Sequence, residues 1–152
     1  MAKPIGVISD THNLLREEAR GRLQGCDLIL HAGDVGSPSI LEELRQIGRV
    51  VAVRGNMDKG PWASELEEVE HVEVDGRRIC VIHDIDRLDL DPAAAGIDVV
   101  VYGHSHKPAV DRQDGVLYLN PGSAGPKRFD LPVSMAMLWI DSKAIHAELV
   151  DL

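Results

Sequence analysis

Two histidines at alternate positions are the first feature of the sequence that could bind a metal ion. His104 and His106 follow the apolar run 99–102, with Gly103 at the point where the run ends. The run is typical of a buried strand, and alternate residues of an extended chain point the same way. We therefore expect both imidazoles to reach one spot, where they could bind a metal ion. A lone His-x-His pair is a weak signal, so the residues upstream decide its meaning.

Four other apolar runs are followed in the same way by acidic, amide or imidazole side chains. These runs cover residues 5–9, 27–31, 50–54 and 79–82. Because open α/β sheets bind their ligands beyond the carboxyl ends of the strands, we expect these side chains to meet at one edge. The candidate metal ligands are Asp10, His12, Asp34, Asn56, His83, His104 and His106.

The number and type of these donors suit two divalent metal ions. Four oxygen or nitrogen donors suit one ion, and seven suit two ions if a carboxylate bridges them, for which Asp34 is the natural residue. Asp10 and Asp34 are the only carboxylates of the set, so two divalent ions would leave the site with a net positive charge. A positive site is what the hydrolysis of an anionic phosphoester requires.

The segments between the first three runs have the spacing of helices that cover a sheet. Apolar residues recur at helical spacing over 15–23 and over 40–47. Ser37 before Pro38 is a typical helix start, with a capping side chain and a proline at the first helical position. The first half of the chain is therefore expected to alternate strands and helices.

The second half of the chain has the pattern of hairpins. Short apolar strands flank turn residues at 75–76, 114–115 and 142–143, and the Asp-Gly pairs of the first two favour hairpin turns. A short capped helix is expected over 91–96. Strand-helix units followed by hairpins indicate two sheets packed face to face with helices outside, in a single domain covering residues 1–152.

Composition and charge exclude several classes of protein. The chain has a formal net charge of -9, so most of its surface would repel nucleic acid or an acidic membrane. The sequence has no apolar run long enough to span a membrane and does not begin like a signal peptide, so we expect a cytoplasmic protein. Cys26 and Cys80 do not form a C-x-x-C pair, and we expect two buried thiols rather than a disulfide.

Five blocks of these residues resemble, in their order, the signature of the calcineurin-like metallophosphoesterases: Asp10-x-His12, Gly33-Asp34, Gly55-Asn56, His83 and Gly103-His104-x-His106. The short chain and the turn at 120–123 resemble the small phosphodiesterase branch of that family. The resemblance implies an α/β fold, namely a four-layer α/β/β/α sandwich of two mixed sheets.

The resemblance also implies how two divalent transition-metal ions would be held. One ion would be bound by Asp10, His12, Asp34 and His106, and the other by Asp34, Asn56, His83 and His104. Manganese is the first expectation, and the mixed oxygen and nitrogen ligands also suit iron, nickel or zinc.

The implied activity is metal-dependent hydrolysis of phosphodiesters. A hydroxide between the ions would attack phosphorus in line with the leaving alkoxide, with Asn56, Asp34 and His104 as the catalytic residues. Asn56 and the ions would stabilise charge on the equatorial oxygens. Many family members have a histidine directly after the Gly-Asn block, where this chain has Met57 and then Asp58. The leaving group is therefore expected to be a good one, or to be protonated by Asp58 or by a metal-bound water.

Two other functions stay open. A retromer subunit that resembles this branch is a non-catalytic scaffold that binds protein partners, but it lacks a ligating histidine at the position of His83. A phosphomonoesterase or protein phosphatase is disfavoured by the missing histidine after Asn56 and by the short chain. We expect a small phosphodiester as the substrate and, through exposed hairpin edges, a homodimer.

Several further residues have two interpretations. His31 is expected to be a buried imidazole that supports the site rather than a ligand, and Asp84 either contacts an imidazole or crowds the metal. Arg54 could contact a substrate phosphate, although an arginine beside a strand end more often pairs with an acid. His71 and His146 alternate with apolar residues in hairpins and are expected on the surface.

Overall fold

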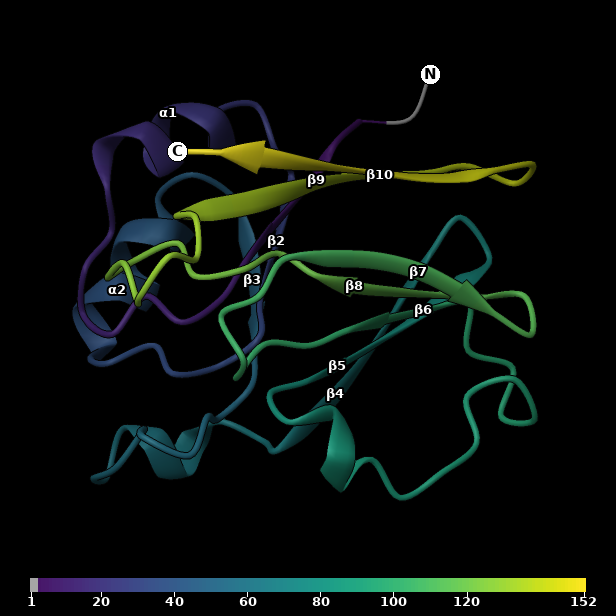
Figure 1. Cartoon of the computed structure of the whole chain (residues 1–152), viewed down its shortest axis with the longest axis horizontal. Coiled ribbons are helices and arrows are strands. Elements are labelled where there is room, and N and C mark those ends of the chain that lie inside the picture. Colours follow the sequence, from purple (N-terminus) through teal and green to yellow (C-terminus); the bar gives the residue numbers. More distant parts are fainter. Residues whose placement is uncertain (1–2) are drawn as a thin grey trace.

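The computed structural model describes residues 3–152 and contains two five-stranded β-sheets that pack face to face (Figure 1). Both sheets combine parallel and antiparallel pairs of strands. The α/β architecture of two mixed sheets that the sequence predicts is therefore confirmed. Within residues 3–152, no helix is both long enough and apolar enough to cross a membrane.

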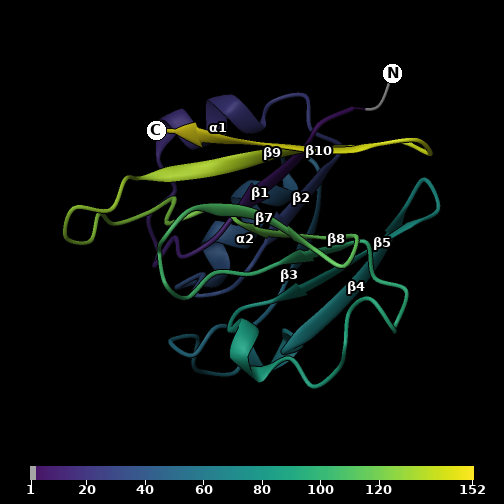
Figure 2. The same cartoon turned by 45° about the vertical axis from the view of Figure 1, so that its right-hand side comes forward.

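The first sheet combines three strands from the start of the chain with two from its end. β1, β2 and β3 are parallel, and the hairpin of β9 and β10 lies antiparallel beside β1 (Figure 2). In spatial order its strands are β10 (Ile145–Asp151), β9 (Ser134–Ile140), β1 (Ile5–Ile8), β2 (Leu28–His31) and β3 (Arg49–Ala52).

Two helices cover the face of the first sheet that points away from the second sheet (Figure 1). They are α1 (Glu17–Leu23) and α2 (Pro38–Arg45). Leu23 and Leu44 are fully buried against residues of the sheet such as Ile29. This apolar stripe is the reason that the helical spacing could be recognised in the sequence.

The start of α2 differs in one detail from the expectation. Pro38 occupies the first helical turn as predicted, but the Ser37 side chain makes no capping hydrogen bond. Ser37 Oγ instead donates to Asn13 Oδ1 at 2.6 Å. The hydroxyl that could have capped the helix therefore holds the loop that follows β1.

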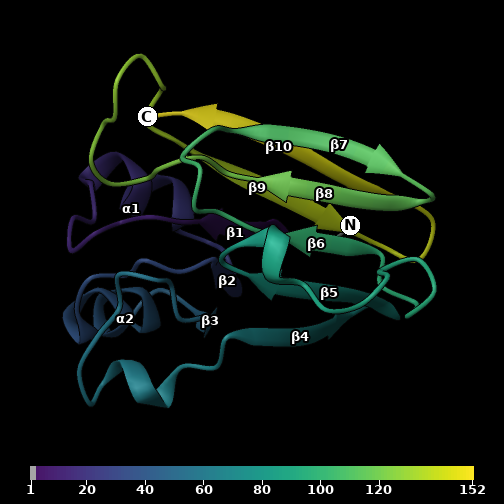
Figure 3. The same ribbon diagram turned by 60° about the horizontal axis from the view of Figure 1, so that its bottom comes forward.

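The second sheet is built from the predicted hairpins around a short central strand. In spatial order its strands are β4 (Val69–Val74), β5 (Arg77–Ile82), β6 (Val99–Val101), β8 (Val116–Asn120) and β7 (Ala109–Gln113). The turns at 75–76 and 114–115 have positive φ at both residues, as their Asp-Gly sequences predict. β5, β6 and β8 are parallel and point toward the same edge of the molecule (Figure 3).

The prediction of a helix over 91–96 is wrong. The segment is a turn in which Ala95 N–H donates to Asp91 O at 2.9 Å and Gly96, with φ of 76°, ends it. One turn with a left-handed glycine at its end is too short to propagate a helix. The outer face of the second sheet is covered instead by the loop 84–98, which includes the 3₁₀ turn η2 (Ile85–Arg87) (Figure 3).

Candidate metal centre

The seven candidate ligands lie together in the loops that follow five strands. Backbone hydrogen bonds join these loops, because Asp10 N–H donates to Gly33 O at 2.9 Å and Gly103 N–H donates to His83 O at 3.0 Å. Asp10 and His12 follow β1, Asp34 follows β2, Asn56 follows β3, His83 follows β5, and His104 and His106 follow β6.

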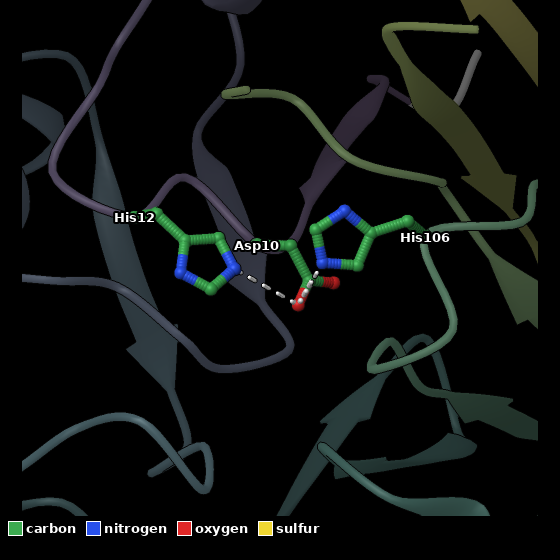
Figure 4. Close-up of side chains that lie close together, drawn as sticks. All are labelled: Asp10, His12 and His106. Atoms are coloured by element: carbon green, nitrogen blue, oxygen red, sulfur yellow. Dashed lines mark ion pairs between the residues drawn. The ribbon is translucent and has the colours of Figure 1, made fainter. Parts of the chain in front are cut away.

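One cluster is formed by Asp10, His12 and His106 (Figure 4). Asp10 Oδ1 lies 3.4 Å from His106 Nε2 and 3.8 Å from His12 Nε2. The Asp10 side chain is fully buried, and the two imidazole rings stack with their centroids 5.4 Å apart. One carboxylate oxygen and two imidazole nitrogens therefore point at one another, an arrangement that suits a divalent ion.

A second cluster is formed by Asn56, His83 and His104. Asn56 Oδ1 lies 3.0 Å from His83 Nε2 and 3.2 Å from His104 Nδ1, and these two nitrogens are 3.3 Å apart. Asp34 lies between the clusters, because its Oδ2 is 3.3 Å from His83 Nε2 and 3.6 Å from His12 Nε2. The two histidines of the His-x-His pair thus belong to different clusters.

Each carboxylate has one oxygen held by the protein and the other aimed at imidazoles. Asp10 Oδ2 accepts from Ser9 Oγ at 2.7 Å and from His104 N–H at 3.2 Å. Asp34 Oδ1 accepts from Met57 N–H at 2.8 Å. Because these bonds fix the orientation of each carboxylate, Asp10 Oδ1 and Asp34 Oδ2 are left free to bind a cation.

The electrostatic balance differs between the two carboxyl groups. Burial raises the pKa of Asp10 above its ordinary value, against the opposing effect of His83 and of the Ser9 hydrogen bond. Burial also acts to raise the pKa of Asp34, but hydrogen bonds from the protonated His83 ring and from Met57 N–H outweigh it and the pKa is lowered. Asp34, the residue between the clusters, is thus held as a carboxylate.

Two of the atoms that face His83 Nε2 are oxygens that cannot donate to it. The other ring nitrogen, Nδ1, lies 2.7 Å from the carbonyl oxygen of Ala32, so we infer that it carries the proton of the neutral ring. The lone pair on Nε2 then faces Asn56 Oδ1 and Asp34 Oδ2, which are themselves acceptors. Facing lone pairs require a cation between them, either a proton or a metal ion.

The pKa of His83 reflects the same arrangement. Burial acts to lower it, but the Asp34 hydrogen bond and the charges of Asp10 and Asp34 outweigh burial and raise the pKa above its ordinary value. A site that holds a proton in this way also offers its nitrogen to a metal ion once that proton leaves.

Unpartnered buried atoms also fit a metal. Within the described chain, three buried side-chain polar atoms have no hydrogen-bond partner, and all three belong to the first cluster: Asp10 Oδ1, His12 Nε2 and His106 Nδ1. A buried polar atom without a partner costs about 1–3 kcal/mol. Because Asp10 Oδ1 and His12 Nε2 face each other, a single cation would satisfy both, and the residues present therefore fit a divalent ion.

The backbone at the site differs from the expectation that alternate residues of an extended strand bring the ligands together. Five of the seven candidates lie beyond their strands with left-handed φ values: Asp10 (56°), His12 (44°), Asp34 (55°), His104 (74°) and His106 (62°). Left-handed residues other than glycine each cost about 1–3 kcal/mol and concentrate at functional sites. Tight turns after the strands, and not strand alternation, therefore aim these side chains.

Asp58 corrects one expectation about leaving-group protonation. Its carboxylate is buried and accepts from Gly55 N–H at 2.9 Å, Gly36 N–H at 3.0 Å and Val35 N–H at 3.2 Å. Both oxygens are occupied by backbone donors, so Asp58 is not placed to donate a proton to a leaving group. It fastens the loop after β3, which carries Asn56, to the loop after β2.

His31 and Asp84 also have structural roles. His31 is fully buried, and its Nδ1 accepts from Gly33 N–H at 3.1 Å while its Nε2 lies 3.0 Å from Thr11 Oγ1. Burial, with the charge of His83, lowers the pKa of His31 to about 3, so it stays neutral and supports the loops as expected. Asp84 Oδ1 accepts from Asp86 N–H at 3.1 Å and caps η2, so neither alternative considered for it describes its contact.

Sequence reasoning missed Ser9 and Asp58 as supports of the site and noted Asn120 only as part of a turn. Asn120 Nδ2 donates to Gly103 O at 3.3 Å and to Ser105 Oγ at 3.1 Å, and thereby holds the loop that carries the His-x-His pair. A polar residue at the end of an apolar run was the available signal. The spacing alone could not show which backbone groups it would contact.

Comparisons with known proteins assign the chain to a family. The model of the calcineurin-like phosphoesterase superfamily domain matches residues 4–143. A probable metallophosphoesterase of Methanothermobacter thermautotrophicus is 35% identical, covering 96% of this chain and 91% of the relative. A phosphodiesterase of Methanocaldococcus jannaschii is 28% identical, covering 78% of this chain and 82% of the relative. A single mutant of Vps29 from Entamoeba histolytica shares the fold, with a TM-score of 0.77 at 22% identity over 98% of this chain and 99% of that chain. The chain therefore belongs to the calcineurin-like phosphoesterase superfamily.

Proposed function

We propose that the protein is a metal-dependent phosphodiesterase with a dinuclear metal site. The position of Asp34 carries this proposal, because its Oδ2 lies between imidazole nitrogens of the two clusters, 3.3 Å from His83 Nε2 and 3.6 Å from His12 Nε2. Asp34 would then be shared by two ions. One ion would be completed by Asp10, His12 and His106, and the other by Asn56, His83 and His104.

The charge of the metal-loaded site and the free amide of Asn56 favour an anionic substrate. Divalent ions bound here, for which manganese is our first choice, would supply positive charge and bring the pKa of a coordinated water toward neutrality. With Asp10 and Asp34 as the only carboxylates among the seven ligands, the loaded site stays positive. Asn56 Nδ2 has no hydrogen-bond partner among residues 3–152 and is free to donate to a phosphate oxygen.

The two positions after Asn56 supply no proton donor, and this favours small diesters with good leaving groups. Met57 stands directly after Asn56, and the next residue, Asp58, is fully engaged by backbone donors. A poor leaving group needs a proton at the moment the bond breaks, and general acid catalysis is worth about 10²–10⁴ in rate. Without that contribution, we expect aryl diesters to be cleaved much faster than alkyl diesters.

Hydrolysis of bis(p-nitrophenyl) phosphate tests the proposed function. Protein stripped with a chelator is expected to be inactive and to regain turnover with manganese. His104→Ala removes a proposed ligand and is expected to lower kcat/KM by about 100-fold or more. His71→Ala is the matched control, because His71 is exposed on β4 and contributes nothing to the site.

The outcomes of that assay separate three functions. Faster turnover of the diester than of p-nitrophenyl phosphate, with loss in His104→Ala, supports the phosphodiesterase. Faster turnover of the monoester would identify a phosphomonoesterase instead. No turnover of either substrate by protein that binds two metal ions would contradict an enzyme and favour a metal-binding scaffold.

Acid is expected to weaken metal binding. A metal ion must replace the proton on His83 Nε2, and the raised pKa of this residue means that the proton is held to a higher pH than on an ordinary imidazole. Metal affinity is therefore full on the alkaline side and falls as the pH drops through that pKa, with most of it lost below about pH 6. Calorimetric titration with manganese between about pH 5 and about pH 8 measures this. Full affinity at the acid end would contradict imidazole ligands.

A further inference from the structure

A cavity of about 280 Å³ opens beside the second cluster. Its lining includes Asn56 and His83, which the proposed function places at the metals, together with three cationic residues, Arg54, Lys59 and Arg87. A group of the substrate next to the scissile phosphate would enter this cavity. Its size is comparable with that of the smallest ligand pockets of proteins, so it could hold one compact polar group.

The acidic residues that line the cavity are already engaged by the protein. The Asp58 carboxylate accepts from three backbone N–H groups, and Asp84 accepts from Asp86 N–H. Glu68 pairs with Arg87, with Oε1 and Nε 3.3 Å apart. These carboxylates keep their negative charge, but within residues 3–152 none of them forms an ion pair with Arg54 or Lys59.

Arg54 and Lys59 are the cations left without an acid. Within residues 3–152 neither forms an ion pair, although the chain has 25 acidic and 16 basic residues. Arg54 is partly buried, and its only side-chain hydrogen bond within residues 3–152 is from Nη1 to Leu66 O at 3.4 Å. Its backbone N–H donates to Glu67 O at 2.9 Å, which fixes the residue at the end of β3. The expectation that Arg54 pairs with an acid is thus wrong.

We propose that this cavity binds a second anionic group of the substrate, held by Arg54 and Lys59. This inference rests on the proposed function, since it assumes that the scissile phosphate lies at Asn56 and His83. Guanidinium groups bind phosphate and carboxylate oxygens through two parallel hydrogen bonds, and a neighbouring ammonium adds a point charge. The preferred substrates are therefore diesters that carry a further phosphate or carboxylate close to the bond that is cleaved.

Matched aryl diesters test this preference. The first substrate, thymidine 5′-(p-nitrophenyl phosphate), has one anionic group. The second is the same diester with a phosphate on the 3′-oxygen. The third is the same diester with a 3′-hemisuccinate, which carries a carboxylate instead. The leaving group is identical in all three. We expect the second anion to raise kcat/KM by about tenfold, mainly through a lower KM, since one charge-assisted hydrogen bond is worth about that factor. The substrate with the larger increase in kcat/KM shows whether the cavity prefers a phosphate or a carboxylate.

Variants that remove a positive charge test whether Arg54 and Lys59 cause the preference for a second anionic group. Arg54→Gln and Lys59→Gln are each expected to lower the ratio of kcat/KM for the doubly anionic and singly anionic substrates by severalfold, and the double variant to bring it near one. Arg45→Gln is the matched control, because Arg45 is exposed at the end of α2, at the opposite edge of the sheet. Lys59 makes no side-chain hydrogen bond in residues 3–152, so Lys59→Gln gives an answer even if Arg54→Gln fails to fold.

Binding measurements separate this inference from the proposed function. Calorimetry with thymidine 3′,5′-bisphosphate and thymidine 5′-phosphate needs no turnover, and we expect the bisphosphate to bind about tenfold more tightly to metal-loaded protein. Equal hydrolysis of the three diesters together with equal binding of the two nucleotides would overturn the inference and leave the phosphodiesterase intact. A protein that cleaves nothing but still prefers the bisphosphate through Arg54 would instead retain the anion site and refute the activity.

Discussion

Asp34→Asn is expected to lower kcat/KM by about a thousandfold or more and to release metal from both clusters. Asparagine has the shape of aspartate, and one of its atoms can still accept from Met57 N–H, which is 2.8 Å away. The carboxylate charge between His12 and His83 is lost, however, and an amide hydrogen would face one of these nitrogens. The change therefore removes the ligand that the two ions would share while leaving the loop in place.

Counting bound metal distinguishes a bridging residue from an ordinary ligand. Elemental analysis of Asp34→Asn is expected to find both ions weakened, whereas Asp10→Asn should weaken mainly the ion beside His12 and His106. Asp27→Asn is the control, because Asp27 is exposed, lies before β2 at the opposite edge and, among the described residues, pairs only with Lys3 at 3.1 Å. Two tightly bound ions and activity within about tenfold of the unmodified protein in Asp34→Asn would exclude Asp34 as the bridge.

The positions of the candidate ligands could be predicted because they depend on local pattern. Asp34, Asn56 and His83 each follow an apolar run that is long enough to form a strand and is stopped by a turn or a polar residue. Parallel strands then place their carboxyl ends at one edge. The same reasoning placed His71 and His146 correctly on the surface and identified Cys26 and Cys80 as buried free thiols.

The way in which the ligands are aimed could not be predicted, because it depends on contacts across the fold. The left-handed φ of His104 and His106 is set by a loop that Asn120 holds through Gly103 O and Ser105 Oγ. A left-handed conformation is unfavourable for histidine, so local propensity gives no signal for it.

The role of Arg54 at the cavity could not be predicted from the sequence either. In the sequence it is one of many arginines in a chain rich in acids, and statistics favour a salt bridge. Only the fold shows that the neighbouring acids Asp58, Asp84 and Glu68 have other partners. Which cationic side chains are free to contact a ligand is therefore determined by the complete set of hydrogen bonds and ion pairs, which a spacing pattern does not contain.

Asp58→Ala is expected to cause the largest loss of stability of any single change near the site. It leaves the N–H groups of Val35, Gly36 and Gly55 without their acceptor, and two of these belong to a loop more than 20 residues away in the chain. A buried donor without a partner costs about 1–3 kcal/mol, so even with water entering the gap we expect a loss of about 3 kcal/mol or more. For a chain of this length that lowers Tm by about 6–12 °C.

The comparison of Asp58→Ala with milder changes shows whether the carboxylate acts through these bonds. Asp58→Asn keeps one acceptor oxygen, so its loss of stability should be about half as large. Asp89→Ala, at an exposed position with no side-chain hydrogen bond within residues 3–152, should leave Tm unchanged. Metal should raise the Tm of Asp58→Ala less than that of the unmodified protein, because the loops that carry Asp34 and Asn56 are no longer fastened together and metal binds less tightly to them. If thermal unfolding gave Asp58→Ala and Asp89→Ala the same Tm, the three hydrogen bonds would contribute nothing and the site would be held by other contacts.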